Sequence, residues 1–295
     1  SFSQWECGDT LIDYRDGQSY PTVKIGTQCW LAKNLNVGKM LKGGDISTNN
    51  DTIEKYCYGD NETNCDIYGG LYIWDEMMNY INTESSQGIC PDGWYVPSDQ
   101  EMKELEIALG MKPETAELYN TWRGTDQGTQ LKSGGSSGYN ALLSGARISA
   151  SSFMQLNSYE FIHTSTEAGN YAWRRCVRND ASSVGRFNSY PKTYALSVRC
   201  ILNYKTVNTN NLNNNQVQIY FANATKTLNI NFGQTLNEKI VFALYDMQGK
   251  KILSDLIQTD SHAIQIPIPN LNNGIYIATV FYDNNLISKK IYFTY

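Results

Sequence analysis

The chain has 295 residues, of which 41% are hydrophobic and 18% charged, and its mean hydropathy is -0.44. This length predicts two domains with separate cores and excludes a mini-protein held together only by disulfides or metals. No apolar run approaches the roughly 18 residues needed to cross a bilayer, so the composition indicates a soluble, globular chain. The net charge of -5 disfavours dense phosphate contacts, and we expect no nucleic-acid partner.

All seven cysteines precede residue 201, at positions 7, 29, 57, 65, 90, 176 and 200. Because they lie among tyrosines, glycines and short turn-bounded segments, we interpret them as cysteines of an oxidising compartment. The alternative is a set of reduced, buried thiols in a cytosolic protein. With no CxxC pair and only His163 and His262, a Cys/His zinc site has too few ligands. The chain starts at Ser1 rather than Met, so we expect that a signal peptide has been removed.

The first predicted domain, residues 1–203, combines short strands with two helices. A hairpin is expected near its start, where the β-rich segments 20–25 and 29–32 flank the turn Gly26-Thr27. Beyond Gly110, glycines and serines separate further strand-like segments, namely 140–143, 147–148, 161–164, 171–175 and 195–201. This mixture predicts an α+β domain.

The two helices are predicted from different signals. The first follows Gly70, and its buried face is indicated by apolar residues at helical spacing: Trp74, Met77, Met78 and Ile81. The second begins with a capping box, in which Ser98 caps the backbone of Glu101 and the Glu101 side chain bonds back to Ser98. Its predicted apolar face consists of Met102, Leu105, Ala108 and Leu109.

An Asn-rich linker is predicted at 204–216, because seven of the thirteen residues from Asn203 to Asn215 are Asn. The second domain, residues 217–295, holds seven β-rich segments: 217–221, 227–232, 239–246, 250–257, 262–268, 274–282 and 286–293. This density of short strands predicts an all-β, Ig-like sandwich. All eight arginines lie in the first domain, while the second carries six lysines and five acidic residues, which suggests separate origins.

A series of sequence blocks runs through residues 7–201. They are Asp16-Gly17, 20–26, 29–35 (Cys-Trp-Leu-Ala-Lys-Asn-Leu), Cys57 to Cys65, 68–74 (Tyr-Gly-Gly-Leu-Tyr-Ile-Trp), 88–94 (Gly-Ile-Cys-Pro-Asp-Gly-Trp), 96–98, 138–142 and 197–200. In this order they resemble the Fibrobacter succinogenes major paralogous (FISUMP) domain. The resemblance implies an α+β C-type-lectin-like fold in a secreted or surface-displayed bacterial protein. The chain departs from the pattern at Cys176, where an aromatic or aliphatic residue is expected.

The C-terminal domain contains three further matching stretches, 241–249, 271–276 and 288–292. They resemble the type A sorting domain of the type IX secretion system of Bacteroidetes, although the usual proline after the first strand is absent. The resemblance implies export through the periplasm, recognition by the translocon and an outer-membrane shuttle protein, and cleavage by a sortase-like peptidase. The residues singled out as the sorting signal are Gly274, Ile275, Tyr276, Lys289 and Lys290.

The cysteine pairing is implied by the first resemblance, because seven cysteines allow too many arrangements for the sequence to choose among them. The implied pairs are Cys7 with Cys29, Cys57 with Cys65, and Cys90 with Cys200. Cys176 is then the free thiol.

Catalytic groups are few in the first domain. His163 is its only histidine, and its strand-like surroundings favour a structural role over a nucleophilic triad. Acidic side chains at 75, 76, 101, 104 and 106 could act as acid or base, but their spacing is typical of helix caps and solvated helix faces. We therefore expect no enzyme activity and no required cofactor.

Two binding sites are conceivable. The loop residues Asp60, Glu62, Asn64 and Asp66 alternate oxygen-bearing side chains that could coordinate calcium, although a solvated acidic loop is the simpler interpretation. The aromatic residues Trp122, Tyr139, Tyr159, Tyr171 and Trp173 could stack on sugar rings, although most are expected in the core.

Together these features predict a cargo of the type IX system, secreted or displayed on the cell surface, whose lectin-like domain binds or adheres to glycans or surface polymers. One alternative is an enzyme resembling the formylglycine-generating oxidases, although their copper-binding cysteine pair has only Cys176 as a counterpart. Another alternative is a structural component of a surface layer.

Overall fold

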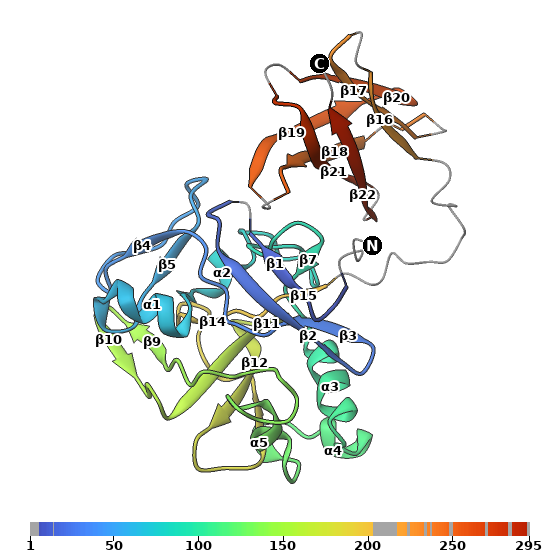
Figure 1. Cartoon of the computed structure of the whole chain (residues 1–295). Coiled ribbons are helices and arrows are strands. Elements are labelled where there is room, and N and C mark those ends of the chain that lie inside the picture. The colour runs from blue at the N-terminus through green and yellow to red at the C-terminus, as the bar shows by residue number, and fades with distance from the viewer. Residues whose placement is uncertain are drawn as a thin grey trace. The chain divides into compact units, whose positions relative to one another are not determined.

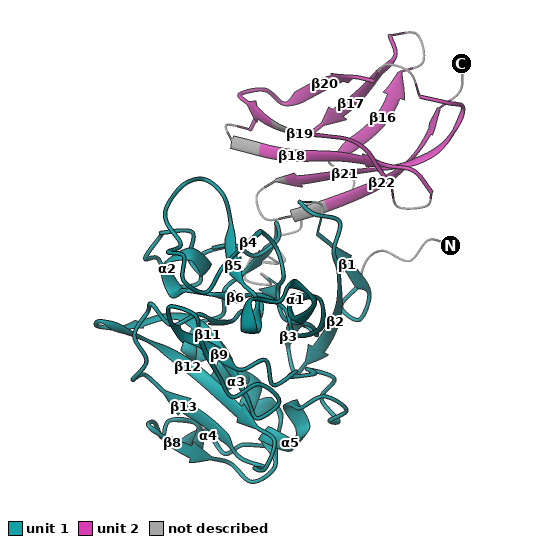
Figure 2. Cartoon of the chain, turned by 90° about the vertical axis from the view of Figure 1, so that its left-hand side faces the viewer, with its two compact units in different colours: residues 1–202 teal, residues 203–295 magenta. Residues whose placement is uncertain are grey.

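The computed structural model describes residues 6–13, 15–202, 217–222, 225–232, 235–236, 238–247, 250–268, 271–282 and 285–293. The chain divides into two compact units, Ser1–Leu202 and Asn203–Tyr295, which are coloured separately in Figure 2. The Asn-rich linker predicted at 204–216 lies outside the described residues. None of the described helices is long and apolar enough to cross a membrane.

A sheet of eight strands is the largest element of the first unit (Figure 1). Its strands, in spatial order, are β4 (Lys39–Leu41), β5 (Glu54–Tyr56), β6 (Leu71–Tyr72), β14 (Leu196–Ser197), β11 (Tyr159–Ala168), β12 (Tyr171–Arg178), β13 (Val184–Phe187) and β8 (Thr121–Arg123). The two longest, β11 and β12, pair antiparallel as a hairpin closed by Gly169-Asn170. Gly169 has a φ of 64°, a left-handed conformation that glycine adopts without steric cost.

A second sheet has five strands and contains the hairpin predicted at the start of the chain. Its order is β1 (Thr10–Ile12), β2 (Ser19–Ile25), β3 (Gln28–Leu31), β15 (Ile201–Leu202) and β7 (Trp94–Tyr95). Strands β2 and β3 meet at Gly26-Thr27, as the turn residues predict. A small pair, β9 (Ala146–Ser149) and β10 (Ser152–Met154), completes the strands described in this unit.

The helices described in the first unit are mostly short, and α3 is the longest. They are η1 (Tyr58–Asp60), α1 (Glu62–Tyr68), α2 (Trp74–Met77), α3 (Asp99–Ala108), α4 (Pro113–Ala116) and α5 (Gln127–Leu131). The capping box predicted for α3 is confirmed, since Ser98 accepts from the Glu101 backbone and the Glu101 side chain accepts from the Ser98 backbone. On its inner face, Met102 and Leu105 share a buried cluster with Ile162 of β11. This contact places α3 against one face of the eight-stranded sheet.

The helix predicted after Gly70 is much shorter than its apolar spacing suggests. Helix α2 ends at Met77, because Asn79 and Tyr80 adopt positive φ values of 51° and 57° that no helix can contain. Ile81, the last residue of the predicted face, is consequently 48% exposed. Tertiary structure therefore overrides the local periodicity here.

The predicted α+β, C-type-lectin-like fold class is wrong, because the described structure is mostly β. Strands hold 43% of it and helices only 13%. The error has a physical origin: α3 is the longest described helix, and the other helical segments are turns that connect strands rather than a helical layer. The core of the first unit is accordingly built by its sheets, with α3 as the main helical contribution.

The described part of the second unit forms seven strands, in agreement with the seven β-rich segments of the sequence. A three-stranded sheet holds β16 (Gln218–Ala222), β17 (Thr227–Asn231) and β20 (Ala263–Pro267), and a four-stranded sheet holds β19 (Lys251–Thr259), β18 (Glu238–Tyr245), β21 (Gly274–Tyr282) and β22 (Asn285–Phe293). Both sheets contribute to one buried cluster, for example Ile230 and Ile266 from the first and Phe242 and Val280 from the second. The unit is therefore a two-sheet sandwich.

Candidate functional site

Successive residues of β12 point to opposite faces of the eight-stranded sheet, as the pleat of a strand requires. Arg175 lies on the face covered by α3, whereas Arg174 and Cys176 lie on the other. The register carries this second face across the sheet, because Cys176 pairs with Phe161 of β11 and with Gly185 of β13. The two faces have different chemistry.

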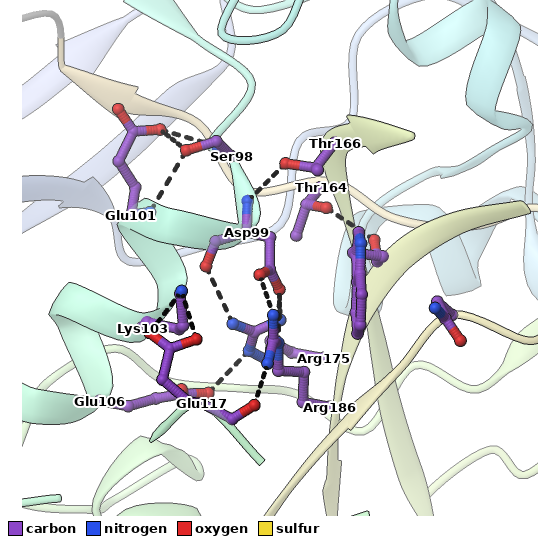
Figure 3. A network of polar contacts seen from close by, with 12 residues as sticks. Ser98, Asp99, Glu101, Lys103, Glu106, Glu117, Thr164, Thr166, Arg175 and Arg186 are labelled. Carbon is purple, nitrogen blue, oxygen red and sulfur yellow. Dashed lines mark hydrogen bonds and ion pairs between the residues drawn. The ribbon is translucent and has the colours of Figure 1, made fainter. Parts of the chain in front are cut away.

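The α3 face is closed by a buried network of ion pairs (Figure 3). Arg175 contacts Asp99 Oδ1 at 2.6 Å through Nη1 and Glu106 Oε1 at 2.7 Å through Nε. Arg186 contacts Asp99 Oδ2 at 2.6 Å, and Arg123 contacts Glu106 Oε2 at 2.6 Å. Each carboxylate therefore bridges two arginines, and the network ties α3 to β8, β12 and β13.

The charge state of this network follows from its geometry. Burial by itself raises the pKa of Asp99, but the positive charges of Arg175 and Arg186 outweigh burial and hold that pKa below its usual value. Glu106 is 1% exposed, so the interpretation of its helix face as solvated is wrong. Since every carboxylate in the network is already paired with arginine, we assign it a structural role.

The opposite face carries a cavity of about 320 Å³. Its walls are aromatic, formed by Trp122, Tyr159, Phe161, Phe187 and Tyr190. The remaining lining residues are Met154, Gln155, Arg174, Cys176 and Ser189, so no Asp or Glu among the described residues lines it. Small-molecule sites typically start near this volume, at about 300 Å³, and are lined mainly by apolar and aromatic groups with a few polar ones.

Arg174 supplies the charge of the cavity. It is 4% exposed, and its Cζ lies 3.5 Å from the ring centroid of Tyr190 and 5.4 Å from that of Phe187. Its Nε and Nη1 atoms have no hydrogen-bond partner, and none of the ion pairs in the described part of the chain includes Arg174. Sequence reasoning missed this residue, although two successive arginines in a strand predict one on each face.

Cys176 lies in the cavity lining as the free, buried thiol that the resemblance implies. Burial raises its pKa to about 11, so the thiol stays protonated at neutral pH. Beside it, Gly185 leaves room for an aromatic ring, since a Cβ there would lie 2.4 Å from Cε2 of Phe187. A protonated, buried thiol is a poor nucleophile and a poor metal ligand.

The five aromatic residues predicted as sugar contacts lie in different parts of the first unit. Trp122 and Tyr159 come together in the cavity, with ring centroids 6.1 Å apart. Tyr139 is fully buried, Trp173 lies beneath the guanidinium of Arg186 on the α3 face, and Tyr171 is 42% exposed outside the cavity. Only two of the five therefore belong to this candidate site.

The structure forms three disulfides, in the pairs that the resemblance implies. Cys7 bonds to Cys29, Cys57 to Cys65, and Cys90 to Cys200. The last pair closes a loop of 110 positions and joins the segment before β7 to the segment before β15. Long-range closure of this kind limits the unfolded chain most strongly.

The four calcium candidates do not converge. Asp60 belongs to η1 and accepts a hydrogen bond from the Gly43 backbone, while Glu62, Asn64 and Asp66 lie on α1. On a helix, alternate residues point in nearly opposite directions, and the Asn64 amide already donates to the Tyr58 carbonyl. Within the described residues, no group of three or more His, Cys, Asp or Glu side chains could hold a metal ion.

His163 is buried in β11, with Nε2 at 3.2 Å and 3.3 Å from the carbonyl oxygens of Tyr72 and Tyr194. Burial lowers its pKa to about 3, so the imidazole is neutral and Nε2 carries the proton that it donates. Neither a serine nor a cysteine hydrogen-bonds to this ring among the described contacts. The structural interpretation of His163 agrees with this geometry.

A second cavity, of about 360 Å³, is polar and includes Arg15, Asn79 and Glu76 in its lining. The Glu76 carboxylate is already occupied, since it accepts hydrogen bonds from Ser47, Tyr80 and the Glu54 backbone. The bond from Tyr80 links the left-handed turn after α2 to the helix. We therefore favour the aromatic cavity as the binding site.

The residues of the predicted sorting signal lie in one hairpin, β21–β22. Lys289 and Lys290 pair with Ala278 and Ile277, on the strand that contains the other three signal residues. Tyr276 is buried, and its hydroxyl donates to the Asn272 carbonyl at 3.1 Å. Lys289 is exposed. The signal thus combines core residues with surface residues.

Comparison with known families now places the chain. Residues 218–294 match the secretion system C-terminal sorting domain, which defines an exported protein of the type IX system. Residues 23–202 match the Fibrobacter succinogenes major domain, and the chain belongs to that family. The sorting domain sends the protein to the cell surface or outside and implies contact with the type IX machinery.

The curated proteins include no match to this chain. Among solved structures, a DUF3244 family protein with an immunoglobulin-like β-sandwich fold from Bacteroides vulgatus ATCC 8482 is similar, at 13% identity and a TM-score of 0.24. The similarity covers 27% of this chain and 84% of that chain.

Proposed function

We propose that this exported protein is a binding protein and that it holds glycans in the aromatic cavity of its first unit. The observation that supports the proposal is the convergence of five aromatic rings, from β8, β11, β13 and the segment after β13, around one space of about 320 Å³. Aromatic faces bind the apolar face of a sugar ring through buried area and weak CH contacts. Such binding would serve adhesion to surface polymers.

We propose binding rather than catalysis for this unit. Cys176 and His163 lie on the same face of the sheet as the cavity, and neither has a pKa near neutral pH. Burial raises the pKa of Cys176 to about 11 and lowers that of His163 to about 3. A general base or nucleophile works best with a pKa near the operating pH. The oxidase alternative would also need a second thiol beside Cys176, and the other six cysteines are in disulfides.

For the second unit, we propose that an outer-membrane shuttle protein recognises the β21–β22 hairpin and that a sortase-like peptidase then removes the unit. The hairpin supports this proposal because its second strand, β22, carries the exposed Lys289.

The binding proposal is tested by applying the full chain to an array of neutral and acidic glycans. We expect binding to at least one class, reduced tenfold or more by Trp122→Ala and unchanged by Tyr171→Ala, which removes an exposed ring outside the cavity. Absence of any binding, or equal loss with both variants, would overturn the proposal. Unchanged thermal unfolding of each variant shows that the loss is local.

A further inference from the structure

We propose that Arg174 binds a carboxylate and that the ligand of the cavity is a carboxylated sugar, a hexuronate unit. This inference rests on the proposed glycan-binding function and names the class of glycan. It starts from a comparison of Arg174 with the other buried arginines of the first unit.

Each of the other buried arginines has oxygen partners. Arg123, Arg175 and Arg186 are paired with carboxylates, Arg147 donates to the Gly43 carbonyl, and Arg199 donates to Asn34 and to backbone carbonyls. Arg174 is buried to a similar degree, but none of the described ion pairs includes it. Its Nε and Nη1 meet no acceptor within hydrogen-bond distance, and the polar groups beside its guanidinium are the Cys176 thiol and the Tyr190 hydroxyl rather than a carboxylate. Arg174 lines the cavity, so these two donors are placed where a ligand could accept their hydrogen bonds.

An unpaired charge removed from water is unfavourable, and cation–π contact offsets only part of that cost. The ring of Tyr190, 3.5 Å from the guanidinium carbon, stabilises the cation but cannot accept the in-plane hydrogen bonds of Nε and Nη1. A planar carboxylate can accept two parallel bonds from a guanidinium. A ligand carboxylate would therefore complete the site.

The rest of the lining indicates what carries the carboxylate. No acidic side chain is among the lining residues, so none would repel an anion there. Arg178, whose guanidinium lies 4.7 Å from the ring centroid of Trp122, is paired with Asp180 at 2.9 Å, so Arg174 is the cation left for the ligand. Trp122 and Tyr159 provide flat apolar surfaces, while Gln155 and Ser189 provide polar groups for hydroxyls. A sugar ring with a carboxylate at one end matches this distribution.

The test compares pairs of sugars that differ only in the carboxylate. Glucuronate and galacturonate are titrated against glucose and galactose, with the full chain, by ligand-observed NMR. We expect each uronate to bind at least tenfold more tightly than its neutral hexose. Equal affinity within each pair, or tighter binding of a sulfated sugar than of the uronate, would overturn the proposal.

Variants assign the preference to Arg174. Arg174→Gln should remove it, and Arg174→Lys should restore only part of it because an ammonium lacks the planar fork. The matched control Arg15→Gln, in the second cavity, should leave it intact. Because Arg174 has no ionic partner and its buried charge is only partly offset, Arg174→Gln should fold with an unfolding midpoint no lower than that of the parent chain, and retention of the preference by that folded variant would overturn the assignment.

The two proposals fail in different ways. If neutral sugars bind and Trp122→Ala weakens them but uronates gain nothing, the glycan site stands and the carboxylate inference is wrong. If no glycan binds at all, both are wrong.

Discussion

Arg174 and Arg175 are neighbours in β12, yet one contacts an aromatic ring and the other contacts two carboxylates. The Cζ atom of Arg174 lies 3.5 Å from the Tyr190 ring centroid, and the nitrogens of Arg175 lie 2.6 Å and 2.7 Å from Asp99 and Glu106. The pleat of the strand separates them, so that one face of the sheet is bound to α3 and the other is left to form a cavity.

The first prediction concerns the buried network. Arg175→Met should lower the free energy of unfolding of the first unit by about 3–5 kcal/mol, because it leaves Asp99 and Glu106 buried with one partner fewer. Urea unfolding followed by tryptophan fluorescence measures this change. Arg174→Met is the matched control, and a comparable loss of stability there would contradict the distinction between the two arginines.

The second prediction concerns the long-range disulfide. Removing it in the double variant C90A/C200A should destabilise the first unit by up to about 4–5 kcal/mol, since the 110-position loop is no longer closed in the unfolded chain. Calorimetry should show the first transition at a lower temperature and the transition of the cysteine-free second unit unchanged. Cys176→Ala, which breaks no disulfide, serves as the control; equal shifts of both transitions would be inconsistent with separate cores.

The third prediction is a pH dependence. Burial lowers the pKa of His163 to about 3, below the value near 6.5 in the unfolded chain. Between pH 6.5 and 3, the unfolded state therefore binds a proton at this residue that the folded state does not bind. This contribution to stability is complete above pH 6.5 and is lost as pH falls toward 3, by about 1.4 kcal/mol per pH unit.

His163→Gln should flatten the pH profile of urea unfolding between pH 6.5 and 4, compared with the parent chain. His262→Gln, a change in the second unit, should retain the slope of the first unit. An identical slope in the parent chain and in His163→Gln would refute the assignment.

The fourth prediction concerns Cys176. Because it is buried and burial raises its pKa to about 11, its thiol should react with a disulfide reagent only when the first unit unfolds. After one hour, the absorbance of the thiolate released from the reagent should be less than about a tenth as large for native protein as for protein in urea. Full reaction under native conditions would mean that the cavity admits the reagent to the thiol.

The fifth prediction separates recognition from folding in the sorting unit. Tyr276→Ala should lower both export and stability, the latter by about 3–5 kcal/mol, because the ring is buried and lies 4.9 Å from that of Phe293. Lys289→Glu should lower export alone, since the side chain is exposed. Protein in the culture medium and thermal unfolding measure the two effects; normal export of Lys289→Glu would remove that lysine from the signal.

Features that depend on local chemistry could be predicted from the amino-acid sequence alone. Gly26-Thr27 predicted the first hairpin, and the Ser98 and Glu101 pair predicted the start of α3. Seven β-rich segments predicted the seven strands described in the second unit. The family blocks implied the disulfide pairs and the export address. In each case the residues that carry the signal lie close together in the chain or follow a family pattern.

Other features depend on which segments pack together in three dimensions. The apolar residues from Trp74 to Ile81 have helical spacing, yet the chain turns at Asn79 and Tyr80. The Tyr80 hydroxyl there donates a hydrogen bond to the Glu76 carboxylate. The cavity could not be predicted because its rings come from segments separated by up to 68 positions, Trp122 to Tyr190, which strand register and the path of the chain after β13 bring together. The two adjacent arginines are both buried, but one lies among aromatic rings and the other among carboxylates, because different elements pack against the two faces of the sheet.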